Sequence, residues 1–240
     1  MEILIIRHAE PNYEIDSLTE KGWREAELLS KKLEKIDITA MYSSPLGRAR
    51  DTAKPTLAKT NHEIEVLEWL REFQGYINHE HMDDSSCCWD LMPSYWTNID
   101  AYYSKDDWYK DELMQSGKVE TEYRWVTSEL DALLAKHGYV HEGRHFRVEK
   151  SNHDRIVFFC HYGVSCVLLS HILGISPVMF WQEFVMQPSA VTSLVTEERE
   201  EGYAIFRMRS YGDTGHLYAG DEEPSLMARF CECYKDDTRH

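Results

Sequence analysis

Two apolar runs of the chain are followed by polar residues. Arg7 and His8 come after the continuous aliphatic run at residues 3–6, and His161 comes after the apolar run at residues 156–160. Such runs are typical of strands that are covered on both faces of a parallel sheet. Ligands of open α/β sheets bind at the carboxyl ends of the strands, so these three side chains are candidates for one shared site.

A second arginine follows another predicted strand, at residues 38–42. Ser44 and Pro45 predict a helix there, with Ser44 as N-cap and Pro45 at the first helical position, which places Arg48 in the first turn. A helix is also expected from about Gly163, and its N-terminus would add free backbone N–H groups and a partial positive charge. Two arginines and two histidines at three strand ends suit a phosphoryl group.

Each of these residues also has an ordinary structural interpretation. A histidine at a strand end is more often a hydrogen-bonded structural residue, and Arg48 alone would usually be a solvated helix arginine. Their joint occurrence in matching local contexts favours the site.

The remaining pattern predicts alternating strands and helices. A helix after Thr19 as N-cap precedes residues 38–42, and further helices are expected at residues 123–134 and 163–173, the latter with Gly174 as C-cap. The other predicted strands are residues 64–67, 191–196 and 203–208. This alternation indicates an α/β fold, a three-layer sandwich with a mostly parallel central sheet and helices on both faces.

Residues 74–118 break the alternation. They hold three of the seven tryptophans and nine acidic residues, against three lysines and no arginine. Forty-five residues make a meagre core of their own. We therefore expect one domain over residues 1–240, with residues 74–118 as a helical or irregular lid whose aromatic side chains stack on or enclose a substrate.

The segments around these residues resemble motifs of the histidine phosphatase superfamily, in its phosphoglycerate mutase-like branch 1. Arg7-His8-Ala9-Glu10 is similar to the family's Arg-His-Gly-Glu signature, and the other similar segments are residues 43–53, 70–75, 159–164 and 189–194. They occur in the family's order over nearly the whole chain, except for residues 74–118.

The resemblance implies a chemical role for each candidate. His8 would be the nucleophile that forms a phosphohistidine, with its other ring nitrogen donating to a backbone carbonyl. Arg7, Arg48 and His161 would hold the phosphoryl oxygens, and Glu72 would protonate the leaving oxygen and then deprotonate water. No metal and no cofactor are required, because arginines and histidines replace the cation.

Two positions depart from the family's glycines, Ala9 and Tyr162. The backbone N–H of Tyr162 would still serve the phosphate while its ring narrows the pocket. Four weaker candidates, each at least as consistent with a loop, cap or supporting role, are Asn12, Tyr13, Thr19 and Glu120.

The net charge limits the partners. With 42 acidic residues against 26 lysines and arginines, the formal charge is −16, which disfavours nucleic acids and anionic membranes. We expect a cytoplasmic protein with reduced cysteines, because no export signal is seen. Cys231 and Cys233 lack the second pair of a zinc site, and His62, His79 and His81 are interpreted as ordinary polar residues.

These observations favour a phosphomonoesterase that acts on a small phosphorylated metabolite and releases inorganic phosphate. A phosphoglycerate mutase is the alternative, but it needs further cations for an acidic substrate. A non-catalytic module that binds phosphoryl groups is the third reading, and His8 and Glu72 argue against it because binding alone needs only cations.

Overall fold

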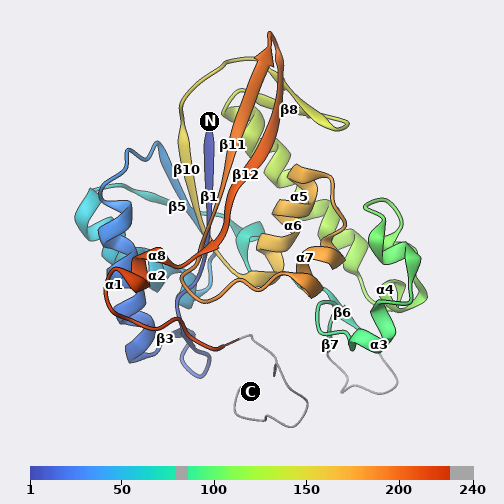
Figure 1. Ribbon diagram of the computed structural model, residues 1–240, viewed down its shortest axis with the longest axis horizontal. Coiled ribbons are helices and arrows are strands. Elements are labelled where there is room, and N and C mark those ends of the chain that lie inside the picture. Colours follow the sequence, from blue (N-terminus) through green and yellow to red (C-terminus); the bar gives the residue numbers. More distant parts are fainter. Residues whose placement is uncertain (79–85, 228–240) are drawn as a thin grey trace.

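The central element is a mixed eight-stranded sheet (Figure 1). The computed structural model describes residues 1–78 and 86–227. In spatial order the strands are β5 (Ile64–Val66), β4 (Ala40–Ser43), β10 (Arg155–Cys160), β1 (Glu2–Arg7), β11 (Val191–Glu200), β12 (Tyr203–Asp213), β9 (His145–Val148) and β8 (Tyr139–Glu142). The first four pair in parallel, and the pairs from β1–β11 onward are antiparallel.

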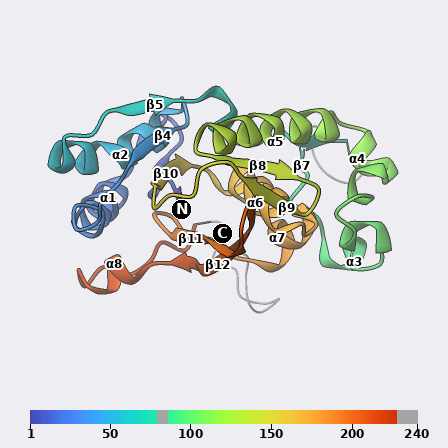
Figure 2. The same cartoon turned by 90° about the horizontal axis from the view of Figure 1, so that it is seen from above.

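Helices cover both faces of this sheet, as Figure 2 shows from above. The α-helices of the described residues are α1 (Glu20–Leu33), α2 (Gly47–Thr60), α3 (Pro93–Trp96), α4 (Glu112–Gln115), α5 (Val119–Lys136), α6 (Tyr162–Leu173), α7 (Pro177–Glu183) and α8 (Gly215–Tyr218). Two small ribbons pair β2 (Pro11–Asn12) with β3 (Ser17–Leu18) and β6 (Tyr76–Ile77) with β7 (Ser86–Cys87). The predicted α/β sandwich is confirmed.

The continuous apolar run of strand β1 is explained by the packing of helices on both of its faces. Ile3 and Ile5 pack in one core with residues of α5 and α6, whereas Leu4 and Ile6 pack in a second core with residues of α1 and α2. Successive side chains of a strand point to opposite faces, so a strand between two helical layers must be apolar at every position.

The predicted helix ends are correct in two cases. The Thr19 hydroxyl accepts a hydrogen bond from the Gly22 N–H at the start of α1, as an N-cap does. Gly174 follows α6 with a φ of +67°, a left-handed conformation that glycine adopts without the steric cost of a Cβ atom.

The predicted start of α2 is wrong. Its first helical residue is Gly47 and its N-cap is Leu46, which has no capping side chain. The Ser44 N–H still bonds to the Phe159 carbonyl of β10, and the Ser44 hydroxyl contacts His161. Ser44 therefore directly follows strand β4 and lies outside the helix.

The sequence patterns also missed the β8–β9 hairpin and α7. In the hairpin only Tyr139 and Phe146 are buried, so its polar residues hide the strand pattern. No helix in the described ranges, 1–78 and 86–227, is long and apolar enough to cross a membrane.

Residues 86–118 pack against α5 and α7 (Figure 1). Trp96, Tyr102 and Trp108 are buried in the larger core, and the Trp108 ring meets the Trp181 ring of α7 edge-on at 5.5 Å between centroids. These three rings are therefore unavailable for the substrate stacking that was expected of the insertion.

Candidate active site

Backbone hydrogen bonds to the chain segments on both sides of β1 hold Arg7 and His8 in place. The Arg7 N–H bonds to the Ala190 carbonyl, the His8 N–H bonds to the Cys160 carbonyl, and the His8 carbonyl accepts from the Ser189 N–H. The His8 side chain is 2% exposed. Both residues thus lie at the carboxyl end of β1, between the ends of β10 and β11.

The ring of His8 is held in one tautomer. Its Nδ1 lies 2.8 Å from the Ala9 carbonyl oxygen, and a carbonyl only accepts, so Nδ1 carries the hydrogen. This leaves the lone pair on Nε2. Burial, and then the nearby Arg7 charge, hold the pKa of His8 well below its usual value, so the ring is neutral.

His161 lies beside it at the N-cap of α6. The two rings have their centroids 5.1 Å apart, and His161 Nε2 lies 2.7 Å from the Ser44 hydroxyl. Its Nδ1 is buried and has no hydrogen-bond partner in the described part of the chain. Burial, followed by the effect of His8, also lowers the pKa of His161 well below its usual value.

The two arginines approach the histidines from different elements. Arg7 Nη1 donates to the Met186 carbonyl, and the Arg7 guanidinium lies 5.6 Å from the centre of the Tyr162 ring. Both arginines keep a buried Nε that lacks a partner among the described residues. Buried donors without partners are rare in native proteins, so they mark a place where an anion would be bound.

Arg48 is already engaged by a carboxylate. Its Nη1 lies 2.7 Å from Asp16 Oδ1, while Asp16 Oδ2 accepts from the Gly47 N–H at 2.6 Å. The Tyr13 ring centre lies 5.4 Å from the Arg48 guanidinium. Asp16 therefore competes with any phosphoryl group for Arg48.

Glu72 lies behind the N-terminus of α6. Its Oε1 accepts from the Phe73 N–H at 2.9 Å and from the Val164 N–H at 3.1 Å. Burial raises the pKa of Glu72, although these hydrogen bonds and then Arg7 and Arg48 oppose the rise. At Gly163 a Cβ would lie 2.9 Å from Glu72 Oε1 and 2.7 Å from Trp89 Cζ3, so only glycine permits this approach.

The structure thus brings Arg7, His8, Arg48, Glu72 and His161 together. Each of the two arginines acts electrostatically on His8, on Glu72 and on His161. The arrangement offers a neutral nucleophile, several N–H donors for an anion, and a carboxyl group whose raised pKa favours the protonated form.

The side chains of Tyr162 and Asn12 make local contacts in the structure. The Tyr162 hydroxyl donates to the Trp181 and Phe184 carbonyls at the end of α7, so its ring supports the site beneath Arg7. The Asn12 side chain accepts from the Glu14 N–H and stabilises a local turn.

Of the weaker candidates, Tyr13 alone meets one of the clustered residues, Arg48. Thr19 caps α1. Glu120 forms an ion pair with Arg124 on α5 and borders a cavity that none of the five clustered residues lines. Cys231, Cys233, His79 and His81 lie outside the described residues, and His62 Nε2 lies 2.9 Å from the Ile38 carbonyl.

Sequence reasoning missed two side chains that hold the cluster in place, Ser44 and Asp16. Ser44 had been interpreted as a cap, and the motif that contains it was the available signal. Asp16 carries no signal in the sequence; its φ of +47° bends the loop after β2 so that its carboxylate reaches Arg48.

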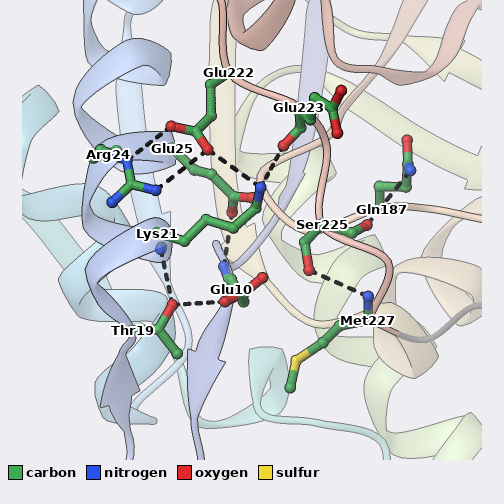
Figure 3. Close-up of polar contacts among 11 residues, drawn as sticks. Glu10, Thr19, Lys21, Arg24, Glu25, Gln187, Glu222, Glu223, Ser225 and Met227 are labelled. Carbon is green, nitrogen blue, oxygen red and sulfur yellow. Dashed lines mark hydrogen bonds and ion pairs between the residues drawn. The ribbon is translucent and has the colours of Figure 1, made fainter. Parts of the chain in front are cut away.

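The first motif is anchored to α1 through Glu10 (Figure 3). The Glu10 N–H donates to Glu25 Oε2 at 2.8 Å, and the Thr19 hydroxyl donates to the Glu10 carboxylate. Burial raises the pKa of Glu25 to about 7. The loop after His8 is therefore fixed to the body of the helix.

The last described residues lie against the same helix (Figure 3). Glu222 forms ion pairs with Lys21 at 3.2 Å and Arg24 at 2.8 Å. The Gln187 side chain donates to the Ser225 carbonyl. Gln187 directly follows Met186, whose carbonyl binds Arg7, so this segment supports the loop behind the cluster.

Comparison with curated proteins gives two partial matches. A stretch of 79 residues is 34% identical to a probable phosphatase of Schizosaccharomyces pombe, covering 29% of this chain and 28% of that protein. Another 79-residue match is 37% identical to a 2,3-bisphosphoglycerate-dependent phosphoglycerate mutase of Thermoplasma acidophilum. It covers 29% of this chain and 40% of that protein. The matches thus span well under half the length of either relative.

Solved structures resemble the chain over most of its length. A phosphoserine phosphatase mutant from Entamoeba histolytica, crystallised with phosphoserine, has a TM-score of 0.60 at 18% identity over 90% of this chain and 98% of its own. A mycobacterial glucosyl-3-phosphoglycerate phosphatase has a TM-score of 0.61 at 16% identity, over 88% of this chain and 98% of its own. At such identities the likeness shows a shared fold.

Part of the sequence also matches a known protein family. Residues 3–103, which include Arg7, His8, Arg48 and Glu72, match the histidine phosphatase superfamily (branch 1). The resemblance drawn from the motifs is therefore confirmed for this part of the chain, which is similar to the histidine phosphatase superfamily, branch 1.

Proposed function

We propose that this chain is a metal-independent phosphomonoesterase that transfers the phosphoryl group of a small metabolite to His8 and then to water. The observation that carries the proposal is the contact between His8 Nδ1 and the Ala9 carbonyl, which leaves a neutral Nε2 with a free lone pair. Partly unpaired guanidinium groups lie beside it. Phosphoryl transfer needs a positioned nucleophile and positive charge around the phosphoryl oxygens, and this arrangement supplies both.

In the first step, the Nε2 lone pair of His8 attacks phosphorus and the ester P–O bond breaks. Glu72 gives its proton to the leaving oxygen, so the alcohol departs neutral. In the second step, the Glu72 carboxylate takes a proton from water, the water oxygen attacks phosphorus, and the P–N bond breaks. Phosphate leaves, and both residues return to their starting states.

The cations support the charge of this reaction. Arg7, Arg48 and His161 would donate hydrogen bonds to the phosphoryl oxygens, and the two arginines would supply the positive charge that a metal ion otherwise provides. Because both hydrogen bonds from the backbone reach Oε1 of Glu72, its Oε2 is left to carry and release the proton.

A phosphoglycerate mutase is the second candidate, and one curated relative carries that name. Such an enzyme needs cations beyond the phosphoryl pocket to hold an acidic substrate. In the insertion, Lys105 pairs with Asp106 at 2.6 Å and Lys110 pairs with Asp107 at 2.5 Å. These two lysines are already neutralised, which favours the phosphatase.

The ring of Trp89 gives the leaving group a partly apolar neighbour. It packs against Gly163, next to Glu72, and is only partly buried. A leaving group that receives its proton from Glu72 would pass close to this ring. We therefore propose an alcohol with an apolar or aromatic part rather than a second phosphate.

The test measures the hydrolysis of an aryl phosphate, as released phosphate, in the presence of a metal chelator. We expect turnover by the wild type and a loss of more than about a thousandfold in His8→Ala, because the nucleophile is removed. His153→Ala, at an exposed histidine, is the matched control and should retain turnover. Persistent turnover in His8→Ala would overturn the assignment.

A second assay separates the two candidate enzymes. The chain is incubated with 3-phosphoglycerate, and released phosphate is compared with the isomerised ester. Release without isomerisation supports the phosphatase, and isomerisation without release would establish the mutase. Binding of vanadate with neither reaction on any ester would favour a non-catalytic module.

A further inference from the structure

Three side chains from three separate elements converge at one point away from the His8 cluster. Asp131 comes from α5, His141 from β8 and His171 from α6. His141 Nδ1 lies 3.0 Å from His171 Nε2, and Asp131 Oδ1 lies 3.1 Å from the first nitrogen and 2.8 Å from the second. Three potential ligand atoms thus form a nearly equilateral triangle.

No arrangement of ring hydrogens satisfies this triangle while Asp131 is ionised. Each ring nitrogen either carries a hydrogen or presents a lone pair, and an ionised carboxylate only accepts. If both nitrogens carry hydrogens, two donors face each other across the 3.0 Å contact between the rings. If one nitrogen presents a lone pair, it faces the lone pairs of Asp131. A cation at the centre would use all three lone pairs at once.

The spacing also matches metal coordination. For metal–ligand bonds of about 2.05 Å, adjacent ligands lie about 2.9 Å apart in an octahedron and about 3.4 Å apart in a tetrahedron. The observed separations of 2.8 to 3.1 Å fit one face of an octahedron. Two histidines and one carboxylate on such a face are typical of divalent transition metals, whereas Mg²⁺ and Ca²⁺ prefer oxygen ligands.

The site has room for further ligands. His141 and His171 line a cavity of about 680 Å³, which also reaches Thr127 and Ser170. Water from this cavity could fill the remaining coordination positions. The His141 ring stacks on Phe146, with 4.6 Å between centroids and 13° between planes, so one ligand is already held in orientation.

We propose that Asp131, His141 and His171 bind one divalent first-row transition-metal ion, with Zn²⁺ as the probe of choice. The ion joins α5, α6 and β8, and water completes its coordination. Its role is structural, because His161 and the other residues of the phosphoryl site lie apart from this cavity. The site is therefore independent of the proposed phosphatase activity.

The first experiment measures zinc binding to the chelator-stripped full chain by calorimetry and by elemental analysis after dialysis. We expect one tightly bound Zn²⁺ per chain and a higher melting temperature when it is bound. His171→Gln should weaken zinc binding at least about a hundredfold. Loss of a residue that only supports a metal ligand lowers metal affinity about 10- to 100-fold, and loss of a direct ligand should lower it more. His145→Gln, on the neighbouring strand β9, is the matched control and should bind as the wild type does.

Equal zinc affinity in His171→Gln and the wild type would overturn the proposal, as would the absence of a stoichiometric site in the wild type. A second measurement works on the wild type alone, so it does not depend on the folding of a variant. Co²⁺ at a site of histidine, carboxylate and water gives weak visible bands without a thiolate charge-transfer band. An intense band of that kind in the near ultraviolet would place the metal on cysteine and contradict the assignment.

Discussion

The part of the chain that the structure describes contains two close pairs of histidines, and the charged groups beside them differ in sign. His8 and His161 have ring centroids 5.1 Å apart beside two arginines, and His141 and His171 have centroids 4.5 Å apart beside Asp131. In the first pair, burial and positive charge keep the rings neutral, and the nearby guanidinium groups attract an anion. In the second, a carboxylate completes a set of lone pairs for a cation.

A pair of histidines does not by itself determine which ligand is bound. An imidazole offers a lone pair or an N–H group, and the charge beside it decides which of these is used. The same residue type therefore serves a proposed nucleophile at one end of the sheet and a proposed metal ligand on α6 and β8.

The largest effect should come from Glu72, the proposed general acid at the anion site. Glu72→Gln should reduce kcat about 10²- to 10⁴-fold for alkyl phosphates, because general acid–base catalysis is lost. For an aryl ester with a good leaving group, the first step needs no acid, so the variant should accumulate the phosphoenzyme. Burst and steady-state phosphate release measure this difference, and equal losses on both esters would contradict the role of Glu72.

The next effect separates the two histidine pairs. His161→Ala should weaken vanadate binding and lower kcat about 10²- to 10³-fold, as expected on removal of one donor to the transition state. The same variant should retain one Zn²⁺ per chain. Loss of zinc binding in His161→Ala would show that the two sites are not separate.

The pH dependence should reflect opposite shifts of two pKa values. Turnover needs neutral His8, whose pKa is lowered, so activity should extend to pH values below the usual histidine range. It also needs protonated Glu72, whose pKa is raised, so kcat should fall as the pH rises through that value. A pH–rate profile of Glu72→Gln should lack the alkaline decline, and an unchanged decline would assign it to another group.

The smallest effect should come from the acid that competes for Arg48. Asp16→Asn removes a charge that lies 2.7 Å from the guanidinium, so KM for the ester should fall, by less than about tenfold, with little change in kcat. Asparagine tolerates the positive φ of this position. Inhibition by phosphate should strengthen by a similar factor, and a rise in KM would show that Asp16 positions Arg48 instead.

The central strands and their polar ends could be predicted from the sequence. The apolar runs before His8 and His161 are long enough to require burial on both faces, and the sheet then brings both residues to one edge. The start of α2 was misplaced because the Ser44 hydroxyl serves His161, and a cap pattern does not show such a tertiary contact.

The proposed cation site could not be predicted in this way. Asp131, His141 and His171 are separated by 10 and 30 residues, which matches no spacing of a local metal motif. They meet because α5, α6 and the unpredicted strand β8 pack together. A site built from three elements is visible only once the packing is known.

In the proposed reaction, His8 carries the phosphoryl group between the two steps. Glu72→Gln is mixed with an aryl phosphate, quenched under mildly alkaline conditions that preserve phosphohistidine, and mapped by mass spectrometry. We predict one acid-labile phosphate on His8 of the Glu72→Gln variant. This phosphate should be absent from the double variant that also carries His8→Ala. An acid-stable phosphate, a phosphate on another residue, or turnover without any phosphoenzyme would contradict the account.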